Sequence, residues 1–272
     1  MSDATRRSGP GLDTSVPNVA RMNDYFLGGK DNFAADRRAA EKVLAIAPEV
    51  RDMAREANAF IGRAVRFLVG EGVTQFVVID SGLPTQNNVH QVARSLDSGA
   101  RVAYVAADPV VLSHARALLA TDDRTAVVEG HVLNPDALLA DPGLRRLVDL
   151  DLPVAVIIRS ALQFIPDEDD PFKSVSVLRD AVAAGSYFVI GHAVFDVRPE
   201  AAGPLVDVYR QVLGRAEDAS RTSAEVLRFF DGLELVEPGL VYARHWRPDN
   251  PLSTLGRQKT WSMGGVARKT GH

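Results

Sequence analysis

The sequence predicts an α/β fold with a mostly parallel central sheet flanked by helices, and three observations support this prediction. Short apolar runs alternate at least four times with segments in which apolar residues recur at helical spacing. The run at 154–159 is apolar up to its last residue, as expected of a central strand that is covered on both faces. Helix start signals separate the runs, for example Asp108 followed by Pro109. Strands and helices that alternate in this way form parallel sheets with right-handed crossovers.

The first part of the chain is predicted to be helical. Apolar residues recur at helical spacing over 36–70, and Pro48 divides this segment into two helices. Residues 1–15 are predicted to form a disordered tail. The rest, 16–272, is predicted to be a single domain, in which 16–70 forms an N-terminal helical cap or lid.

The alternation of strands and helices begins after residue 70. Strands are predicted at 75–79, 101–106, 125–130, 154–159, 186–191, 233–238 and 258–269. Helices are predicted at 87–96, 109–119, 135–147, 170–184, 204–213 and 223–230. Ligands of such sheets bind beyond the carboxyl ends of the strands, so the residues that follow each strand are the first candidates for a site.

The composition is that of an ordinary globular protein, with 46% hydrophobic and 24% charged residues among 272. The net charge of −4 gives no indication of a nucleic acid or an anionic membrane as a partner. No apolar run reaches the roughly 18 residues of a membrane span, and the first residues do not resemble a secretory signal, so we expect a cytoplasmic protein. The absence of cysteine excludes disulfides and thiolate sites, and the histidine spacing predicts no metal site.

Six sequence blocks resemble one bacterial protein family, in the same order along the chain. The most specific block is 17–33, with the core Asp-Tyr-Phe-Leu-Gly-Gly-Lys-Asp-Asn-Phe at 24–33. The others are Gly-Leu-Pro-Thr at 82–85 with Asn-Val-His at 88–90, Asp-Pro-Val-Val-Leu at 108–112 with His-Ala-Arg at 114–116, Phe-Ile-Pro-Asp at 164–167, Gly-Ser-Tyr at 185–187 with His-Ala at 192–193, and Arg-His-Trp-Arg-Pro at 244–248. Together they are similar to the S-adenosyl methyltransferases formerly known as a domain of unknown function.

The resemblance implies a Rossmann-like class I methyltransferase fold, with S-adenosylmethionine as cofactor and a small molecule as substrate. In the N-terminal block, Gly28 and Gly29 suit a loop that packs closely, so we expect this block to close over the cleft as a lid. The residues expected to form the lid or to contact the substrate are Tyr25, Lys30, Asn32, Phe33 and His192.

The positions that hold the cofactor in this fold carry unusual residues. The first strand usually ends in Asp-x-Gly-x-Gly, and aligned on Gly82 this chain has Val78 for the acid and Asp80 for the first glycine. Ala106 replaces the acid that binds the ribose, and His131 replaces the acid near the adenine. Each lost charge-assisted hydrogen bond costs roughly 1.5–3 kcal/mol, so several losses weaken binding by decades. Asp80 offers a replacement contact to the cofactor's ammonium group from its shifted position.

Polar side chains occupy the ends of the predicted strands. His131 is a candidate acid or base because imidazole titrates near neutral pH. Arg159 is a candidate to pair with Asp80 or to bind a substrate carboxylate. The candidate catalytic residues are therefore His131, Arg159 and Tyr25. The candidate cofactor-binding residues are Asp80, Ser81, Gly82, Ala106, Asp108, His131, Ser160 and Gln163. The residues Tyr209, Arg210, Phe229, Phe230 and Trp246 are expected in the core.

Three functions are open on the sequence alone. The first is a methyltransferase with an atypical cofactor site that acts on a small molecule. The second is an enzyme that kept the fold but does not methylate, and instead catalyses a cyclisation, isomerisation or elimination on a substrate resembling a natural product. The third is a non-catalytic binding protein. The residues at the cofactor positions make S-adenosylmethionine a doubtful cofactor. Affinity for S-adenosylmethionine distinguishes the first function from the second, and catalytic turnover distinguishes both of them from the third. The substrate and the oligomeric state are open as well.

Overall fold

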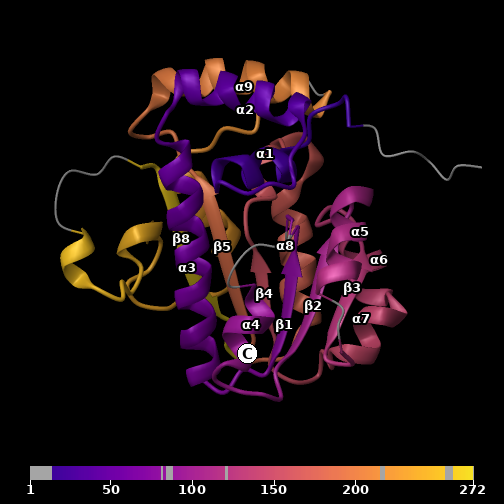
Figure 1. Ribbon diagram of the computed structural model, residues 1–272. Coiled ribbons are helices and arrows are strands. Elements are labelled where there is room, and N and C mark those ends of the chain that lie inside the picture. Colours follow the sequence, from indigo (N-terminus) through magenta and orange to yellow (C-terminus); the bar gives the residue numbers. More distant parts are fainter. Residues whose placement is uncertain are drawn as a thin grey trace, which may run out of the picture.

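The computed structural model describes residues 14–80, 82–83, 88–119, 122–214, 218–254 and 260–271. Figure 1 shows a central sheet with helices on both of its faces and a layer of helices across one of its ends. This is the α/β architecture that the sequence predicts.

Five parallel strands form the body of the sheet, in the spatial order β3-β2-β1-β4-β5. They are β1 (Gln75–Ile79), β2 (Arg101–Ala106), β3 (Thr125–Glu129), β4 (Ala155–Ile158) and β5 (Tyr187–Ala193). The next strand, β8 (Ser262–Arg268), is antiparallel to β5, and the short β6 (Glu234–Leu235) and β7 (Val241–Tyr242) pair with β8. The strand order changes direction between β1 and β4, which is the switch point at which such sheets bind ligands.

Helices connect the strands, and three of them begin at acidic side chains. The helices are α4 (Val89–Arg94), α5 (Pro109–Leu118), α6 (Pro135–Ala140), α7 (Pro142–Leu147), α8 (Pro171–Ala181), α9 (Pro199–Leu213) and α10 (Ser223–Leu227). Asp108, Asp141 and Asp170 each accept a backbone N–H from the first turn of α5, α7 and α8. A proline follows each of these acids, and it costs no hydrogen bond there because the first N–H of a helix has no intrahelical acceptor.

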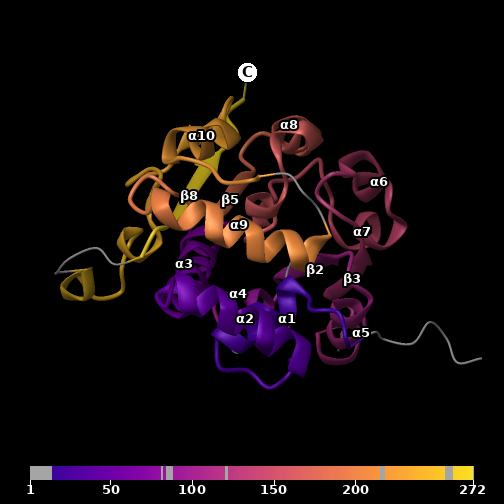
Figure 2. The same ribbon diagram turned by 90° about the horizontal axis from the view of Figure 1, so that it is seen from above.

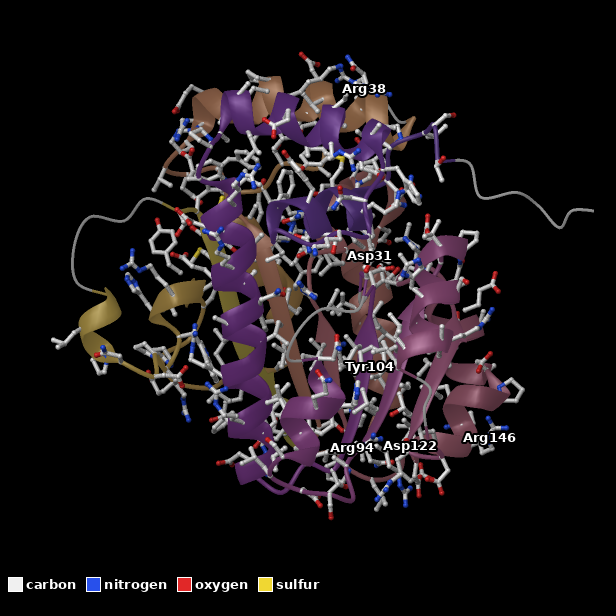
Figure 3. The ribbon with its side chains drawn as sticks, viewed as in Figure 1. Asp31, Arg38, Arg94, Tyr104, Asp122 and Arg146 are labelled. Atoms are coloured by element: carbon white, nitrogen blue, oxygen red, sulfur yellow. The ribbon has the colours of Figure 1, made fainter. Side chains whose placement is uncertain are left out.

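The central strands are apolar along most of their length because helices cover both faces of the sheet. Val77, Ile79 and Ile158 pack in one hydrophobic cluster, which includes side chains of α6, α7 and α8. Their neighbours Val78 and Ile157 point to the other face and pack in a second cluster, which includes side chains of α3 and α4. At the amino ends of the parallel strands, Arg94 and Asp122, which Figure 3 labels, form an ion pair of 2.7 Å.

The N-terminal segment is helical, as predicted, and consists of α1 (Val19–Phe26), α2 (Ala34–Ile46) and α3 (Val50–Gly70). Pro48 lies between α2 and α3. The long α3 runs beside the sheet, whereas α1, α2 and α9 lie across the end at which the parallel strands finish (Figures 1 and 2). This arrangement puts a roof over the carboxyl ends of the strands. Within the described part of the chain, no helix is both long enough and apolar enough to cross a membrane.

The structure differs from the sequence-based expectation at several elements. The helix predicted over 135–147 is two helices, because Asp141 caps α7 and Pro142 cannot continue the hydrogen bonds of α6. Helix α9 begins earlier than predicted, at Pro199. The strand predicted over 233–238 shrinks to β6, and α1 and β7 were not predicted. Residues 1–13 of the predicted tail, and 258–259 of the last predicted strand, lie outside the described residues.

Candidate functional site

A cavity of about 400 Å³ lies between the carboxyl ends of the strands and the roof formed by α1, α2 and α9. Its volume is within the range of ligand pockets. The side chains that line it at the strand ends are those of Asp80, Ala106, Ala107, Asp108, His131, Arg159, Ser160, Gln163, Ala193, Phe195, Trp261 and Ser262, with the backbone of Gly82. Several predicted cofactor-binding residues thus lie in one cavity. Ser81 lies outside the described residues.

Asp80 follows β1 directly, and one of its carboxylate oxygens has no hydrogen-bond partner among the described residues. Its φ of 51° is a left-handed conformation, which costs a non-glycine residue of order 1 kcal/mol. The Oδ2 atom is buried and makes no hydrogen bond with the described residues. Burial raises the pKa of the Asp80 carboxyl above its usual 3.8, and the opposing charge of His131 offsets part of this shift. The arrangement is a strained, poorly solvated acid that faces a cavity.

Arg159 follows β4, the strand next to β1, so it lies at the same edge of the sheet as Asp80. Its Nη2 donates to Oδ1 of Asn58 on α3. Burial lowers the pKa of Arg159 to about 10, which leaves the guanidinium charged at neutral pH. The ion pairs of the described residues do not include Asp80 with Arg159, and the other candidate role of Arg159, binding of a carboxylate, stays a prediction. The next residue, Ser160, bonds through its hydroxyl to the Arg159 carbonyl at 2.7 Å.

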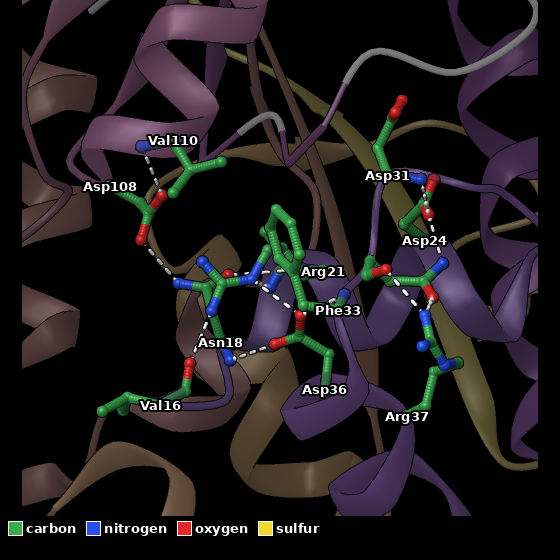
Figure 4. A network of polar contacts seen from close by, with 12 residues as sticks. Val16, Asn18, Arg21, Asp24, Asp31, Phe33, Asp36, Arg37, Asp108 and Val110 are labelled. Atoms are coloured by element: carbon green, nitrogen blue, oxygen red, sulfur yellow. Dashed lines mark hydrogen bonds and ion pairs between the residues drawn. The ribbon is translucent and has the colours of Figure 1, made fainter. Parts of the chain in front are cut away.

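The ends of β2 and β3 offer few groups to a ligand. Ala106 and Ala107 carry no polar side-chain atom. Both oxygens of Asp108 are occupied, because Oδ1 accepts the N–H groups of Val110 and Val111 at 2.8 and 3.0 Å and Oδ2 accepts Asn18 Nδ2 at 2.7 Å. Asp108 therefore starts α5 and ties the N-terminal segment to the sheet, as Figure 4 shows.

His131 has its ring orientation fixed by the backbone. Nδ1 accepts the N–H of Leu133 at 3.2 Å. In the neutral form of the ring the proton is therefore on Nε2, since each nitrogen of a neutral imidazole has one role. Gln163 also lines the cavity, and its Oε1 accepts the Ala193 N–H at 3.1 Å.

His192 lies outside the cavity lining, although it was expected to face the substrate. Its ring is 2% exposed. Nδ1 donates to the Ala193 carbonyl at 2.5 Å, and Nε2 lies 3.3 Å from Nη1 of Arg221. Burial lowers the pKa of His192 to about 4, so the ring is neutral at neutral pH. These contacts give His192 a place in the packing beneath the site.

The N-terminal block builds a tight turn after α1. The carboxylate of Asp24 accepts the Asp31 N–H at 2.9 Å and Asn32 Nδ2 at 2.8 Å. A Cβ on Gly29 would lie 1.9 Å from Asp24 Oδ1, so only glycine fits against this carboxylate. Figure 4 shows both bonds to the carboxylate. Within the motif Asp-Tyr-Phe-Leu-Gly-Gly-Lys-Asp-Asn-Phe, the residues Asp24, Gly29 and Asn32 are therefore the ones that stabilise this turn.

A buried ion pair holds α1 against α2. Arg21 Nε lies 2.9 Å from Asp36 Oδ2, and the two side chains are 3% and 0% exposed. Asp36 also accepts the N–H groups of Asn18 and Phe33, each at 2.8 Å. Arg21 Nη2 donates to the carbonyl of Val16 at 2.6 Å. Figure 4 shows this network, which joins the start of α1 to the start of α2.

The block contacts the cavity through residues that the sequence did not single out. Tyr25, Lys30, Asn32 and Phe33 do not line it. Tyr25 donates to Glu41 and stacks under Arg51, and Phe33 is 39% exposed. The residues of this segment that line the cavity are instead Asn18, Val19, Ala20, Asn23 and Phe26.

The wall and the roof supply the other lining residues. They are Val43, Val50, Met53, Ala54 and Ala57 from α2 and α3, and Leu205, Val206, Tyr209, Arg210 and Leu213 from α9; Ala161, Phe164 and Ile165 after β4 and Ala219 and Ser220 after α9 also line the cavity. Tyr209 and Arg210 were expected in the core, whereas Phe229, Phe230 and Trp246 are buried there as expected. Over the described part of the chain, no cluster of three or more His, Asp or Glu side chains could hold a metal ion.

The whole chain is similar to known proteins. The family described as S-adenosyl methyltransferase matches residues 5–270. The chain belongs to this family. A candidate methyltransferase from Thermobifida fusca YX is 40% identical, with 96% of this chain and 98% of that one covered and a TM-score of 0.89. A DUF574 family protein from Streptomyces avermitilis MA-4680 is 36% identical, with 94% and 99% covered and a TM-score of 0.88.

More distant structures share the fold of the S-adenosyl methyltransferase family. Plantazolicin methyltransferase BpumL, solved with a substrate analogue and S-adenosylhomocysteine, is 9% identical, covers 92% of this chain and 96% of its own, and gives a TM-score of 0.53. The comparison with curated proteins found no match. The resemblance and the methyltransferase fold predicted from the sequence are confirmed.

Proposed function

We propose that this family member binds S-adenosylmethionine through a shifted acid, Asp80, and transfers the methyl group to a small molecule. The observation that carries the proposal is the buried Oδ2 of Asp80 in the floor of the cavity, which no described residue hydrogen bonds. A buried carboxylate oxygen without a donor is costly, and the α-ammonium group of the cofactor is a donor of the right charge. Asp80 also stands beside the switch point between β1 and β4.

The residues of the cavity fit the amino acid end of the cofactor and do not fit its ribose. Asp80 offers an acceptor to the ammonium group, and Arg159 on the neighbouring strand offers a cation to the carboxylate. Ala106 offers no acceptor to the ribose hydroxyls, and Asp108 is occupied by Asn18 and by α5. We therefore expect the cofactor to be held mainly by its amino acid end.

The roles of the side chains follow from their strands. The cofactor, when bound, supplies an electrophilic methyl group, and the roof of α1, α2 and α9 keeps water from it. His131 follows β3, which lies three strands from β4, or roughly 14 Å at ~4.8 Å per strand. His131 therefore belongs to the cofactor side of the cavity, where its charge acts on Asp80. Ser160 and Gln163, which follow β4, stand between the two sides.

Titration calorimetry with S-adenosylhomocysteine tests the role of Asp80. We expect binding by the native chain and a loss of about tenfold to a hundredfold in Asp80→Asn, since a charge-assisted hydrogen bond contributes about 1.5–3 kcal/mol. Asp136→Asn, an exposed acid at the start of α6, is the matched control and should bind as the native chain does. Equal affinity of Asp80→Asn and the native chain would contradict the proposal.

Restoring an acid at the end of β2 should strengthen cofactor binding. We expect Ala106→Asp to raise the affinity for S-adenosylhomocysteine at least tenfold, through a new charge-assisted bond to the ribose hydroxyls. Ala137→Asp, at an exposed position of α6, is the control for an added charge. Val78 does not line the cavity and packs among apolar side chains, so an acid there would be buried away from the ligand and is a poorer test. No gain in the Ala106→Asp variant would contradict this account of the cavity.

A second candidate function is acid–base catalysis without methyl transfer, such as cyclisation, isomerisation or elimination. It is favoured by the pair of titratable groups, Asp80 and His131, at positions where the fold usually contacts its cofactor. The calorimetry above separates the two functions. Absence of binding up to millimolar S-adenosylmethionine and S-adenosylhomocysteine would favour the second one.

A further inference from the structure

The cavity extends beyond the strand ends that face a cofactor. On the far side of β4, its floor consists of Phe195, Trp261 and Ser262, which lie at the ends of β5 and β8. We call this part the α9 chamber; the lining residues that define it are Phe164, Phe195, Val206, Tyr209, Trp261 and Ser262. Strand β8 lies three strands from β1, or roughly 14 Å at ~4.8 Å per strand. A ligand in the chamber therefore lies beside the Asp80 site and not in it.

The walls of the α9 chamber are apolar or neutral. Two of the described arginines approach it, and each is ion-paired with acids that do not line the cavity. Arg198 stacks on Trp261 at 5.1 Å from the ring centre and pairs with Glu49 and Glu200. Arg210, on α9, pairs with Asp207 at 2.7 Å. A ligand with a net charge would lose its hydration in this chamber without gaining a counter-ion from its lining.

The chamber has a polar anchor in the hydroxyl of Tyr209. The hydroxyl makes no hydrogen bond with any of the described residues, although the ring is fixed against Phe164 at 4.9 Å between centroids. Asn23 and Ser262 also line the cavity, and no side-chain bond joins either of them to another described residue. Ligand pockets of this type bind an apolar body and orient it by a few neutral polar groups.

We propose that the α9 chamber binds a flat, uncharged aromatic molecule with a hydroxyl or carbonyl group, which hydrogen bonds to Tyr209. The aromatic side chains of Phe164, Phe195 and Trp261 match a flat apolar body. On the proposed function, this aromatic ligand is the molecule that accepts the methyl group. Its binding to the chamber needs no cofactor.

Calorimetry without cofactor tests the chamber with three probes of one shape: 2-naphthol, 2-naphthoate and 2-naphthylmethylammonium. At pH 7 we expect 2-naphthol to bind at least tenfold more tightly than either charged probe, since an unpaired charge in an apolar site costs more than the ~1.4 kcal/mol of one decade. Tyr209→Phe should lower the affinity for 2-naphthol about fivefold, which is the effect of losing one neutral hydrogen bond. Tyr242→Phe, outside the cavity, is the matched control.

A filling variant separates the chamber from the cofactor side. Val206→Trp, on the cavity face of α9, should abolish 2-naphthol binding and leave the titration with S-adenosylhomocysteine unchanged. Equal or tighter binding of a charged probe, no binding of 2-naphthol, or an unchanged affinity in Tyr209→Phe would overturn the proposal. Loss of S-adenosylhomocysteine binding alone would refute the proposed function and leave the chamber's ligand class intact.

Discussion

Replacement of Asp36 by alanine is expected to lower the free energy of unfolding by about 3–5 kcal/mol, the usual cost of removing one partner of a buried ion pair. The substitution leaves Arg21 charged at 3% side-chain exposure. It also removes the acceptor of the N–H groups of Asn18 and Phe33. Urea unfolding followed by circular dichroism measures the loss, which should appear as a lower midpoint.

Two further variants show whether the ion pair is the cause. The double variant Arg21→Met with Asp36→Leu removes both charges and should recover part of the loss, because no charge is left buried alone. Asp207→Ala breaks the exposed pair with Arg210 and should change the unfolding free energy by about 1 kcal/mol or less. A loss in Asp36→Ala no larger than in Asp207→Ala would contradict the prediction.

The ion pair also bears on the site, because α1 carries residues that line the cavity. Ala20, Asn23 and Phe26 are spaced by three residues, so they share one face of α1. Loosening of α1 in Asp36→Ala should therefore lower the affinity for both 2-naphthol and S-adenosylhomocysteine. Val206→Trp should lower only the affinity for 2-naphthol. The N-terminal block acts on the cavity through the helix that it holds in place.

The parallel sheet could be predicted because its signals are local. Fully apolar runs and the pairs Asp108-Pro109 and Asp170-Pro171 determine strands and helix starts within a few residues. The division at Asp141-Pro142 carries the same signal and could have been read from the sequence. Asn18, which caps α1 through the N–H groups of Ala20 and Arg21, is the signal that could have predicted this helix.

The candidate site could be predicted only where topology determines it. Asp80, Ala106, His131 and Arg159 follow parallel strands, and the carboxyl ends of such strands share one edge. The positions of Tyr209 and Trp261 depend on how α9 and β8 dock over that edge, which no local pattern encodes. Tyr25 was expected at the cavity because the sequence does not show which way each side of α1 faces. In the structure its hydroxyl instead donates to Glu41. Whether the strand-end residues act in the proposed roles stays a prediction.

Replacement of Asp80 by asparagine is expected to stabilise the protein at neutral pH, although it weakens ligand binding. In the folded chain the pKa of Asp80 is raised above 3.8 by burial, so ionisation is easier in the unfolded chain. Below pH 3.8 the group is protonated in both states and costs nothing. As the pH rises through the raised pKa, the native chain loses stability that the asparagine variant keeps.

The expected gain at pH 7.5 is about 1–3 kcal/mol, because the asparagine amide is neutral whereas the native carboxyl must ionise in a buried place, and each kcal/mol shifts Tm by about 2–4 °C. Differential scanning calorimetry of Asp80→Asn, with Asp136→Asn as the exposed control, should show this gain at pH 7.5 and a smaller one near pH 4. The burial of His192 acts on all these chains alike, so it cancels in the difference. A Tm of Asp80→Asn below that of the native chain at pH 7.5 would contradict the prediction. A gain in stability joined to a loss of S-adenosylhomocysteine binding is the trade-off expected of a group kept for its ligand and not for the fold.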